Sequence, residues 1–183
     1  FSGSPAVAGT DRTYSLDVLP QEYPVFGMGD YREGALELEN ADGSYGVEFV
    51  YKERKILDEK YSLRGLPASY RNNNEKVSTL EITLMDDITQ IEVKLLYGVF
   101  EEKDIITRAT KVVNLGKEKI NLLKVDSVSL DKNLEKELDV IHFHGRHNME
   151  RQYERTAIGN SMFSIGSHRG SSSHQHNPFM ILC

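Results

Sequence analysis

The residues best suited to chemistry in this sequence are six histidines, all in its last third. His142, His144 and His147 follow an H-x-H-x-x-H spacing. Residues two apart on a strand share a face, so His142 and His144 are placed to present imidazoles to one zinc ion, with a third ligand from the following turn. The competing interpretation makes them solvent-facing strand residues beside a basic loop at residues 146–155. No nearby carboxylate is placed to orient the imidazoles, so we expect no metal site and no cofactor.

The other three histidines fall in a polar segment at residues 165–179, IGSHRGSSSHQHNPF. Apolar residues flank this segment at 162–165 and 179–182, which predicts that its polar groups are held at the rim of a sheet. We interpret the segment as a docking surface. A second segment, at residues 19–32, places turn formers between aromatic residues. From the two segments we expect interface or rim residues at Asp30, Tyr31, Arg32, Arg169, His174, Gln175, His176 and Asn177.

Catalytic chemistry finds no support in the residue pattern. A glycosidase requires two carboxylates held a few ångströms apart. The candidate pairs occupy predicted turns and exposed faces, where charges serve solubility: Asp86 with Asp87, Glu101 with Glu102, and Glu135 with Glu137. The serine run lacks a G-x-S-x-G pattern, and Cys183 has no base nearby in sequence. We therefore expect no catalytic residue in this chain.

Composition limits the class of protein and its partners. A chain of 183 residues with 39% hydrophobic and 27% charged residues is typical of one globular domain. Its formal net charge of -6 argues against affinity for nucleic acid or anionic membranes. From this charge we expect neither a nucleic-acid nor a membrane partner. The single cysteine excludes an internal disulfide, so we expect a cytoplasmic location. The chain begins with Phe1 and ends on an apolar run, from which we expect a piece of a longer protein, truncated at both ends.

Period-two alternation of apolar residues dominates the pattern and predicts strands. The clearest cases are residues 80–84 and 91–99, joined by a turn at Asp86 and Asp87. Similar alternation appears at residues 47–51, 107–113, 120–125 and 140–143, with Asn- and Gly-rich turns at 40–43 and 114–117. Only residues 131–138 suggest a helix, with Asp131 as its N-cap. The pattern predicts an all-β protein.

Several blocks of the sequence resemble the amino-terminal β-sandwich domain of bacterial α-galactosidases of glycoside hydrolase family thirty-six. The two polar segments carry the resemblance, together with DRTYSLD at 11–17, GLPASY at 65–70, TLEI at 79–82 and IITR at 105–108. The resemblance runs nearly end to end and implies one large, many-stranded antiparallel β-sandwich of the supersandwich type over residues 1–183. The sequence departs from the family at residues 144–151, where many relatives have a tryptophan and a further arginine.

The resemblance also implies a function for a longer parent protein. Relatives are cytoplasmic, retaining exo-α-galactosidases that remove terminal galactose from sugars of the melibiose and raffinose type, and their catalytic aspartates belong to a (β/α) barrel that follows this domain. The implied partners are that C-terminal catalytic barrel, a galactoside substrate at the rim, and further copies in a homo-oligomer, commonly a tetramer. This chain would then be the non-catalytic N-terminal domain, contributing to domain packing, oligomerisation and the active-site rim.

One substrate contact follows from the same resemblance. Arg12 lies in the DRTYSLD block, which approaches the mouth of the active site, so its guanidinium is placed to donate hydrogen bonds to sugar hydroxyls. A salt bridge to Asp11 or Asp17 is the competing explanation. The alternative function is a free-standing carbohydrate-binding or assembly module, in which Tyr23, Phe26 and Tyr31 would stack on sugar instead of packing in the core.

Overall fold

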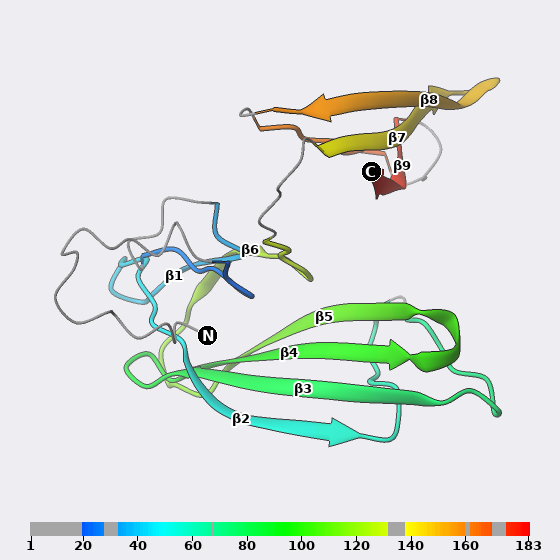
Figure 1. The fold of residues 1–183 in the computed structure, drawn as a ribbon. Coiled ribbons are helices and arrows are strands. Elements are labelled where there is room, and N and C mark those ends of the chain that lie inside the picture. Colours follow the sequence, from blue (N-terminus) through cyan, green and yellow to red (C-terminus); the bar gives the residue numbers. More distant parts are fainter. Residues whose placement is uncertain (1–19, 28–32, 67, 132–137, 160–161, 170–174) are drawn as a thin grey trace, which may run out of the picture. The chain divides into compact units, whose positions relative to one another are not determined.

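The computed structural model describes residues 20–27, 33–66, 68–131, 138–159, 162–169 and 175–183, and these residues are nearly all sheet and connecting loops (Figure 1). The chain divides into two compact units, Phe1–Asp131 and Lys132–Cys183. All strand ladders in the described residues are antiparallel, which confirms the predicted all-β class. Within the same residues, no helix has the length and apolar character needed to cross a membrane.

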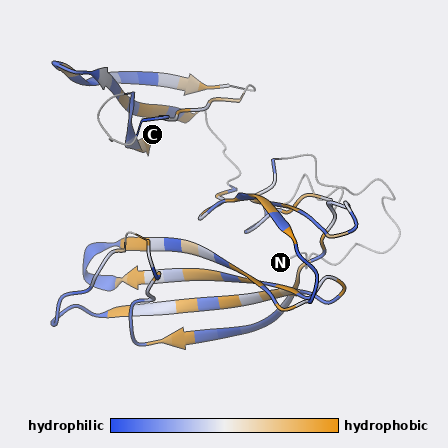
Figure 2. Cartoon of the chain, turned by 180° about the vertical axis from the view of Figure 1, so that it is seen from behind, coloured by the Kyte–Doolittle hydropathy of each residue, from blue (hydrophilic) through white to orange (hydrophobic). Residues whose placement is uncertain are grey.

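The first unit contains two antiparallel sheets. The larger has the order β2-β3-β4-β5, built from β2 (Val50–Leu57), β3 (Val77–Asp86), β4 (Ile91–Phe100) and β5 (Ile105–Asn114). The smaller pairs β1 (Leu36–Glu39) with β6 (Asn121–Val125). Orange and blue bands alternate along the larger sheet in Figure 2, as expected when one face of each strand packs and the other meets water.

The core of the first unit joins these two sheets. Leu36 and Leu38 of β1 belong to one buried cluster with Ile91, Val93 and Leu95 of β4. All five side chains are at most 1% exposed. Burying branched aliphatic side chains of this size contributes about 1.5–3 kcal/mol each. The unit is therefore a β-sandwich, as the family resemblance implied.

The alternation predicted for β4 breaks in its middle. Leu95 and Leu96 point to opposite faces, yet both are buried. The connection after β2 covers the second face, because the hydroxyl of Thr79 donates to the carbonyl of Glu59 and a Cβ at Gly98 would lie 2.8 Å from the side chain of Lys60. The second half of β4 is thus covered on both faces, which explains its apolar run from Leu95 to Phe100, whereas Glu92 and Lys94 of the first half are only half-buried on the second face.

The second unit is a three-stranded sheet with the order β8-β7-β9, built from β7 (Leu138–Arg146), β8 (Met149–Ile158) and β9 (His176–Leu182). One prediction is wrong here. Residues 146–155 do not form a basic loop, because the strand β8 begins at Met149. The predicted helix at 131–138 lies mostly outside the described residues, but its last residue, Leu138, starts a strand.

The hairpin of β7 and β8 contains a bulge. Arg146 pairs with Met149, whereas His144 pairs with Gln152, so two residues of β8 stand opposite Gly145. One of them, Arg151, has a left-handed φ of 56°. A Cβ at Gly145 would lie 2.5 Å from the carbonyl oxygen of Met149, so only glycine fits this position without a backbone shift.

Candidate functional site

The predicted site residues fall partly outside the described residues. Arg12, Asp30, Tyr31, Arg32 and His174 all lie there, so their roles stay predictions.

The remaining predicted rim residues are described and lie around the start of β9. The backbone N–H of His168 donates to Oε1 of Gln175 at 2.7 Å, and the N–H of Gly145 donates to the carbonyl of Gln175 at 3.1 Å. The N–H of Arg169 donates to the hydroxyl of Ser167 at 3.2 Å. His176 and Asn177 are half-buried members of the strand itself. Part of the polar segment is therefore tied to the β7–β8 hairpin.

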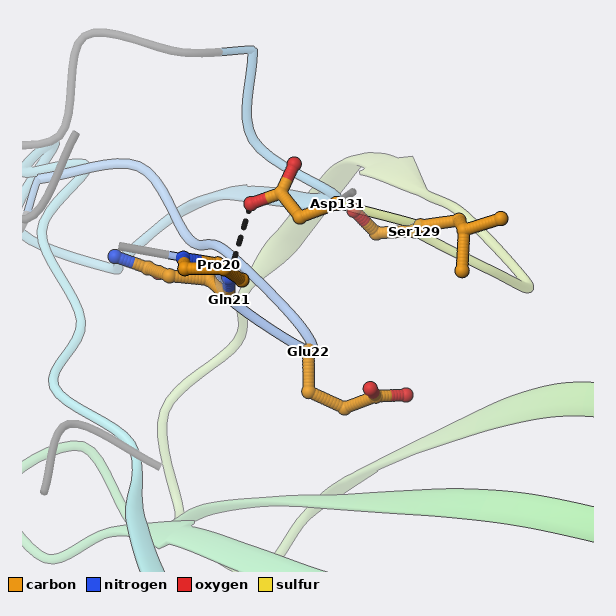
Figure 3. Close-up of a pocket in the computed structure, with 6 residues that line it drawn as sticks. Pro20, Gln21, Glu22, Ser129 and Asp131 are labelled. Carbon is orange, nitrogen blue, oxygen red and sulfur yellow. Dashed lines mark hydrogen bonds between the residues drawn. The ribbon is translucent and has the colours of Figure 1, made fainter. Parts of the chain in front are cut away.

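The first unit holds an open pocket of about 180 Å³ (Figure 3). It is lined by Pro20, Gln21, Glu22, Ser129, Leu130 and Asp131. The N–H of Gln21 donates to Asp131 at 2.9 Å and joins the two segments. Two carboxylates reach this pocket, but its volume lies below the range of about 300–1,000 Å³ typical of small-molecule sites.

The carboxylate of Glu22 belongs to a cluster formed with Tyr97 and Arg108. Arg108 donates to Oε1 of Glu22 at 2.6 Å, and the hydroxyl of Tyr97 donates to the same oxygen. Tyr97 and Arg108 are cross-strand partners on β4 and β5, and the guanidinium lies 3.8 Å from the centre of the tyrosine ring. Burial, and then the hydrogen bond to Glu22, raises the pKa of Tyr97 above its usual value. The sequence analysis did not predict this cluster, although Arg108 ends the IITR block and Glu22 lies in the segment at residues 19–32.

Of the other carboxylate pairs named in the sequence, Glu135 and Glu137 lie outside the described residues. Asp86 is only 3% exposed and accepts hydrogen bonds from the backbone N–H groups of Glu48, Ile88 and Thr89. The expectation that it serves solubility is wrong, because it organises the turn between β3 and β4. Its neighbour Asp87 forms an exposed ion pair with a lysine, as expected of a surface charge.

The aromatic residues of the segment at residues 19–32 also have structural roles. Tyr23 is buried and its hydroxyl donates to the carbonyls of Ala35 and Asp126, so core packing is confirmed for it. Phe26 is 54% exposed and meets Tyr45 edge to face, with ring centroids 6.4 Å apart.

In the second unit, one face of the sheet collects histidines. His142 stands opposite Glu154 of β8, and His144 stands opposite His176 of β9. One oxygen of Glu154 lies 3.8 Å from Nε2 of His142 and 3.4 Å from Nδ1 of His144. The Nε2 atom of His142 is also 3.5 Å from the hydroxyl of Thr156.

Two sequence interpretations of this region are wrong. The ring of His142 does not face solvent, because its side chain is only 4% exposed. A carboxylate does stand beside the imidazoles, because β8 brings Glu154 to them. His147 lies in the exposed turn between β7 and β8 and does not belong to the group of His142, His144 and Glu154 whose ligand atoms lie within 4.8 Å of one another.

Comparison with known proteins places these features in a family. The model of the "Glycosyl hydrolase family 36 N-terminal domain" matches residues 2–183. The bifunctional α-galactosidase/sucrose kinase AgaSK of Mediterraneibacter gnavus is 49% identical over 100% of this chain and 19% of its own length. The α-galactosidase Mel36A of Lactobacillus acidophilus is 40% identical over 100% of this chain and 25% of its own length.

Solved structures of such enzymes agree with the fold. The α-galactosidase AgaA of Geobacillus stearothermophilus, solved in complex with raffinose, matches with a TM-score of 0.88 and 38% identity over 100% of this chain and 25% of that one. The galactosidase domain of AgaSK matches with a TM-score of 0.86 and 49% identity over the same shares. This chain therefore spans a quarter or less of the length of these relatives.

Proposed function

Because this chain belongs to the N-terminal domains of glycosyl hydrolase family 36, we propose that it is the non-catalytic N-terminal domain of a retaining exo-α-galactosidase. The observation that carries the proposal is the end-to-end match with proteins named α-galactosidases, of which this chain spans at most a quarter. The substrates would be terminal α-galactosides of the melibiose and raffinose type, and a relative has been solved in complex with raffinose. We place the parent enzyme in the cytoplasm.

The two carboxylates that line the pocket support a non-catalytic role. Hydrolysis with retention needs one carboxylate as nucleophile and another as acid, about 5–5.5 Å apart, around a bound sugar ring. Glu22 and Asp131 line the pocket of the first unit, but Glu22 is held by Arg108 and Tyr97 and Asp131 by the backbone of Gln21. These carboxylates are engaged in joining segments of the fold.

The last strand supports a docking role. β9 is an edge strand, and Phe179, Met180, Ile181 and Leu182 are 46–56% exposed. An edge strand with apolar side chains on both faces is a template for further pairing and packing, and folded proteins cover such edges. We propose that the C-terminal catalytic barrel or a neighbouring subunit of a homo-oligomer, a tetramer by family resemblance, covers it together with the rim residues.

Arg12 is the proposed contact with the galactoside. In the parent enzyme, Arg12→Ala is expected to lower kcat/KM by about 1.5–3 kcal/mol in transition-state binding, the range for a hydrogen bond to a charged group, and to leave Tm nearly unchanged. Arg64→Ala removes an exposed arginine of the same domain and serves as the control. Lower stability with normal kinetics would instead show that Arg12 forms a salt bridge.

The non-catalytic role is tested by changing the two pocket carboxylates in the parent enzyme. Glu22→Gln and Asp131→Asn are expected to leave kcat within about threefold, because neither group touches the reacting bond in this proposal. Hydrolysis of a chromogenic α-galactoside measures it. A loss of several orders of magnitude in a folded variant would move the catalytic site into this chain.

The alternative is a free-standing carbohydrate-binding module, and the exposed pair of Phe26 and Tyr45 favours it. Aromatic faces bind sugar rings by stacking. In that case Tyr45→Ala would abolish retention on an immobilised galactoside, and the reading frame would hold no catalytic barrel.

A further inference from the structure

Two imidazoles and one carboxylate converge on one face of the β8-β7-β9 sheet. The ligand atoms of His142, His144 and Glu154 all lie within 4.8 Å of one another. His176 adds a third imidazole, with its ring centroid 5.7 Å from that of His142 and 6.3 Å from that of His144. These residues come from three different strands, so the fold and not the local sequence assembles them.

Hydrogen bonding within the described residues does not account for this cluster. The Nδ1 atoms of His142, His144 and His176 are buried there without a hydrogen-bond partner. A buried polar atom without a partner costs about 1–3 kcal/mol. Of the three atoms, Nδ1 of His144 is the one that faces the carboxylate of Glu154, at 3.4 Å, so this nitrogen is placed to bind a ligand shared with Glu154.

We propose that His142, His144 and Glu154 bind one divalent transition-metal ion, for which Zn²⁺ is the expected occupant. Imidazole nitrogen and carboxylate oxygen are ligands that zinc prefers, whereas the hard ions Mg²⁺ and Ca²⁺ prefer oxygen alone. Three protein ligands leave one tetrahedral position, which water or His176 completes.

The geometry fits such an ion after a small adjustment. Metal–ligand distances of about 2.0–2.2 Å place the ligand atoms of a tetrahedral site roughly 3.3–3.5 Å apart. The carboxylate of Glu154 already lies 3.4 Å from His144 and 3.8 Å from His142. The side chain of Glu154 is 53% exposed and is free to rotate by the remaining few tenths of an ångström.

The arrangement resists collapse in the absence of metal. His142 is fixed by its burial and by the ring of Phe163, whose centroid is 5.3 Å away. The backbone of His144 is fixed by pairing on both sides, to Gln152 and to His176. Its side chain is 42% exposed, so rotation of the His144 ring and of the Glu154 carboxylate brings their ligand atoms, now within 4.8 Å of that of His142, to tetrahedral distance.

The test is a calorimetric titration of the full-length protein with Zn²⁺ after chelator treatment. We expect one binding event that Glu154→Gln and His144→Ala each weaken by at least about tenfold. His147→Ala is the matched control, because His147 belongs to the same H-x-H-x-x-H motif but lies in the exposed turn. Its affinity for Zn²⁺ is expected to equal that of the natural protein.

A second measurement separates loss of ligand from loss of fold. Co²⁺ bound to nitrogen and oxygen ligands in a tetrahedron gives visible absorption bands, which Glu154→Gln should diminish while the melting curve of the metal-free protein stays unchanged. Absence of Zn²⁺ binding to the natural protein overturns the proposal. Equal affinity in Glu154→Gln, His144→Ala and the natural protein overturns it as well, because the bound ion would then lie elsewhere.

Discussion

The two units each build a cross-strand cluster around one glutamate, but on different ladders and with different partners. Glu22 meets Arg108 and Tyr97, which stand opposite each other in the unbroken hairpin of β4 and β5. Glu154 meets His142 and His144 across a hairpin whose register shifts at a bulge.

The partners decide what each glutamate can do. An arginine is always charged, so Glu22 has a permanent counter-ion within the fold and serves structure. Imidazoles carry no permanent charge, so that cluster gains most from a cation supplied from outside. The carboxylate of Glu22 is thus neutralised by a residue of the fold, whereas that of Glu154 can bind a cation from outside.

The largest expected effect comes from replacing Gly145, which stands opposite the bulge of β8 in the hairpin that carries His142, His144 and Glu154. Gly145→Val places a Cβ 2.5 Å from the carbonyl of Met149 and 2.8 Å from Cα of Glu150, both backbone atoms. The hairpin must shift, and we expect a loss of about 2–3 kcal/mol in unfolding free energy together with Zn²⁺ affinity. Chemical denaturation measures the first quantity. Gly166→Ala, where a Cβ would meet nothing within 4 Å, should stay within about 0.5 kcal/mol of the natural protein.

The cluster of Glu22, Tyr97 and Arg108 should lose stability when Arg108 is replaced. Arg108→Ala removes the ion pair with Glu22 and the guanidinium that stacks on the ring of Tyr97, and the arginine side chain is only 15% exposed. We expect a loss of about 1–3 kcal/mol, reduced by the 44% exposure of Glu22. Added Zn²⁺ should not restore this loss. Arg108→Lys should recover part of it, since lysine keeps the charge but not the planar stacking on Tyr97.

A smaller effect, dependent on pH, is expected from Tyr97→Phe. The hydrogen bond to Glu22 contributes about 0.5–1.5 kcal/mol. Because the folded state holds the Tyr97 proton more tightly than an unfolded chain with a pKa of about 10, this stability is complete below pH 10 and is lost as the pH rises through the raised pKa. The variant should therefore be less stable at pH 8 and show a shallower decline above pH 10. Tyr70→Phe, at an 83% exposed position, should leave the alkaline profile unchanged.

The smallest expected effect has the opposite sign. Arg151 is exposed and holds a left-handed φ of 56°, which costs an ordinary residue about 1 kcal/mol. Arg151→Gly should raise the unfolding free energy by roughly 0.5 kcal/mol after the entropy cost of glycine is subtracted, and it should keep the Zn²⁺ affinity. A stability loss of 1 kcal/mol or more would show that the side chain of Arg151 forms a contact that its exposure does not suggest.

The sequence predicted the central strands of the first unit because the spacing of their apolar residues follows which side chains are buried. β4 covers nearly the predicted residues 91–99, and β3 contains the predicted residues 80–84 but extends over Val77–Asp86. β8 was missed because its sequence MERQYERTAI is largely polar and mostly exposed. β1 is four residues long and offers too little pattern to be recognised.

The two clusters escaped prediction for separate physical reasons. Glu22 and Arg108 are 86 positions apart, so only the packed fold brings them together. Glu154 was overlooked because residues 146–155 were interpreted as a loop. Even a regular hairpin through the turn at His147 and Asn148 would place Tyr153, not Glu154, opposite His142. The bulge shifts the register by one residue, which moves every later side chain of β8 to the other face.

The bulge also lets this hairpin lose one residue without a change in the strand pairing beyond it. Glu150 and Arg151 together stand opposite the single residue Gly145, so a deletion of Arg151 would convert the bulge into a regular ladder without altering the pairing of His142 with Glu154. An insertion or deletion further along β8 would instead exchange the two faces of the strand. Variants of this protein that differ in hairpin length by one residue can therefore share the same chemistry on the histidine face, provided that the change is confined to these two positions.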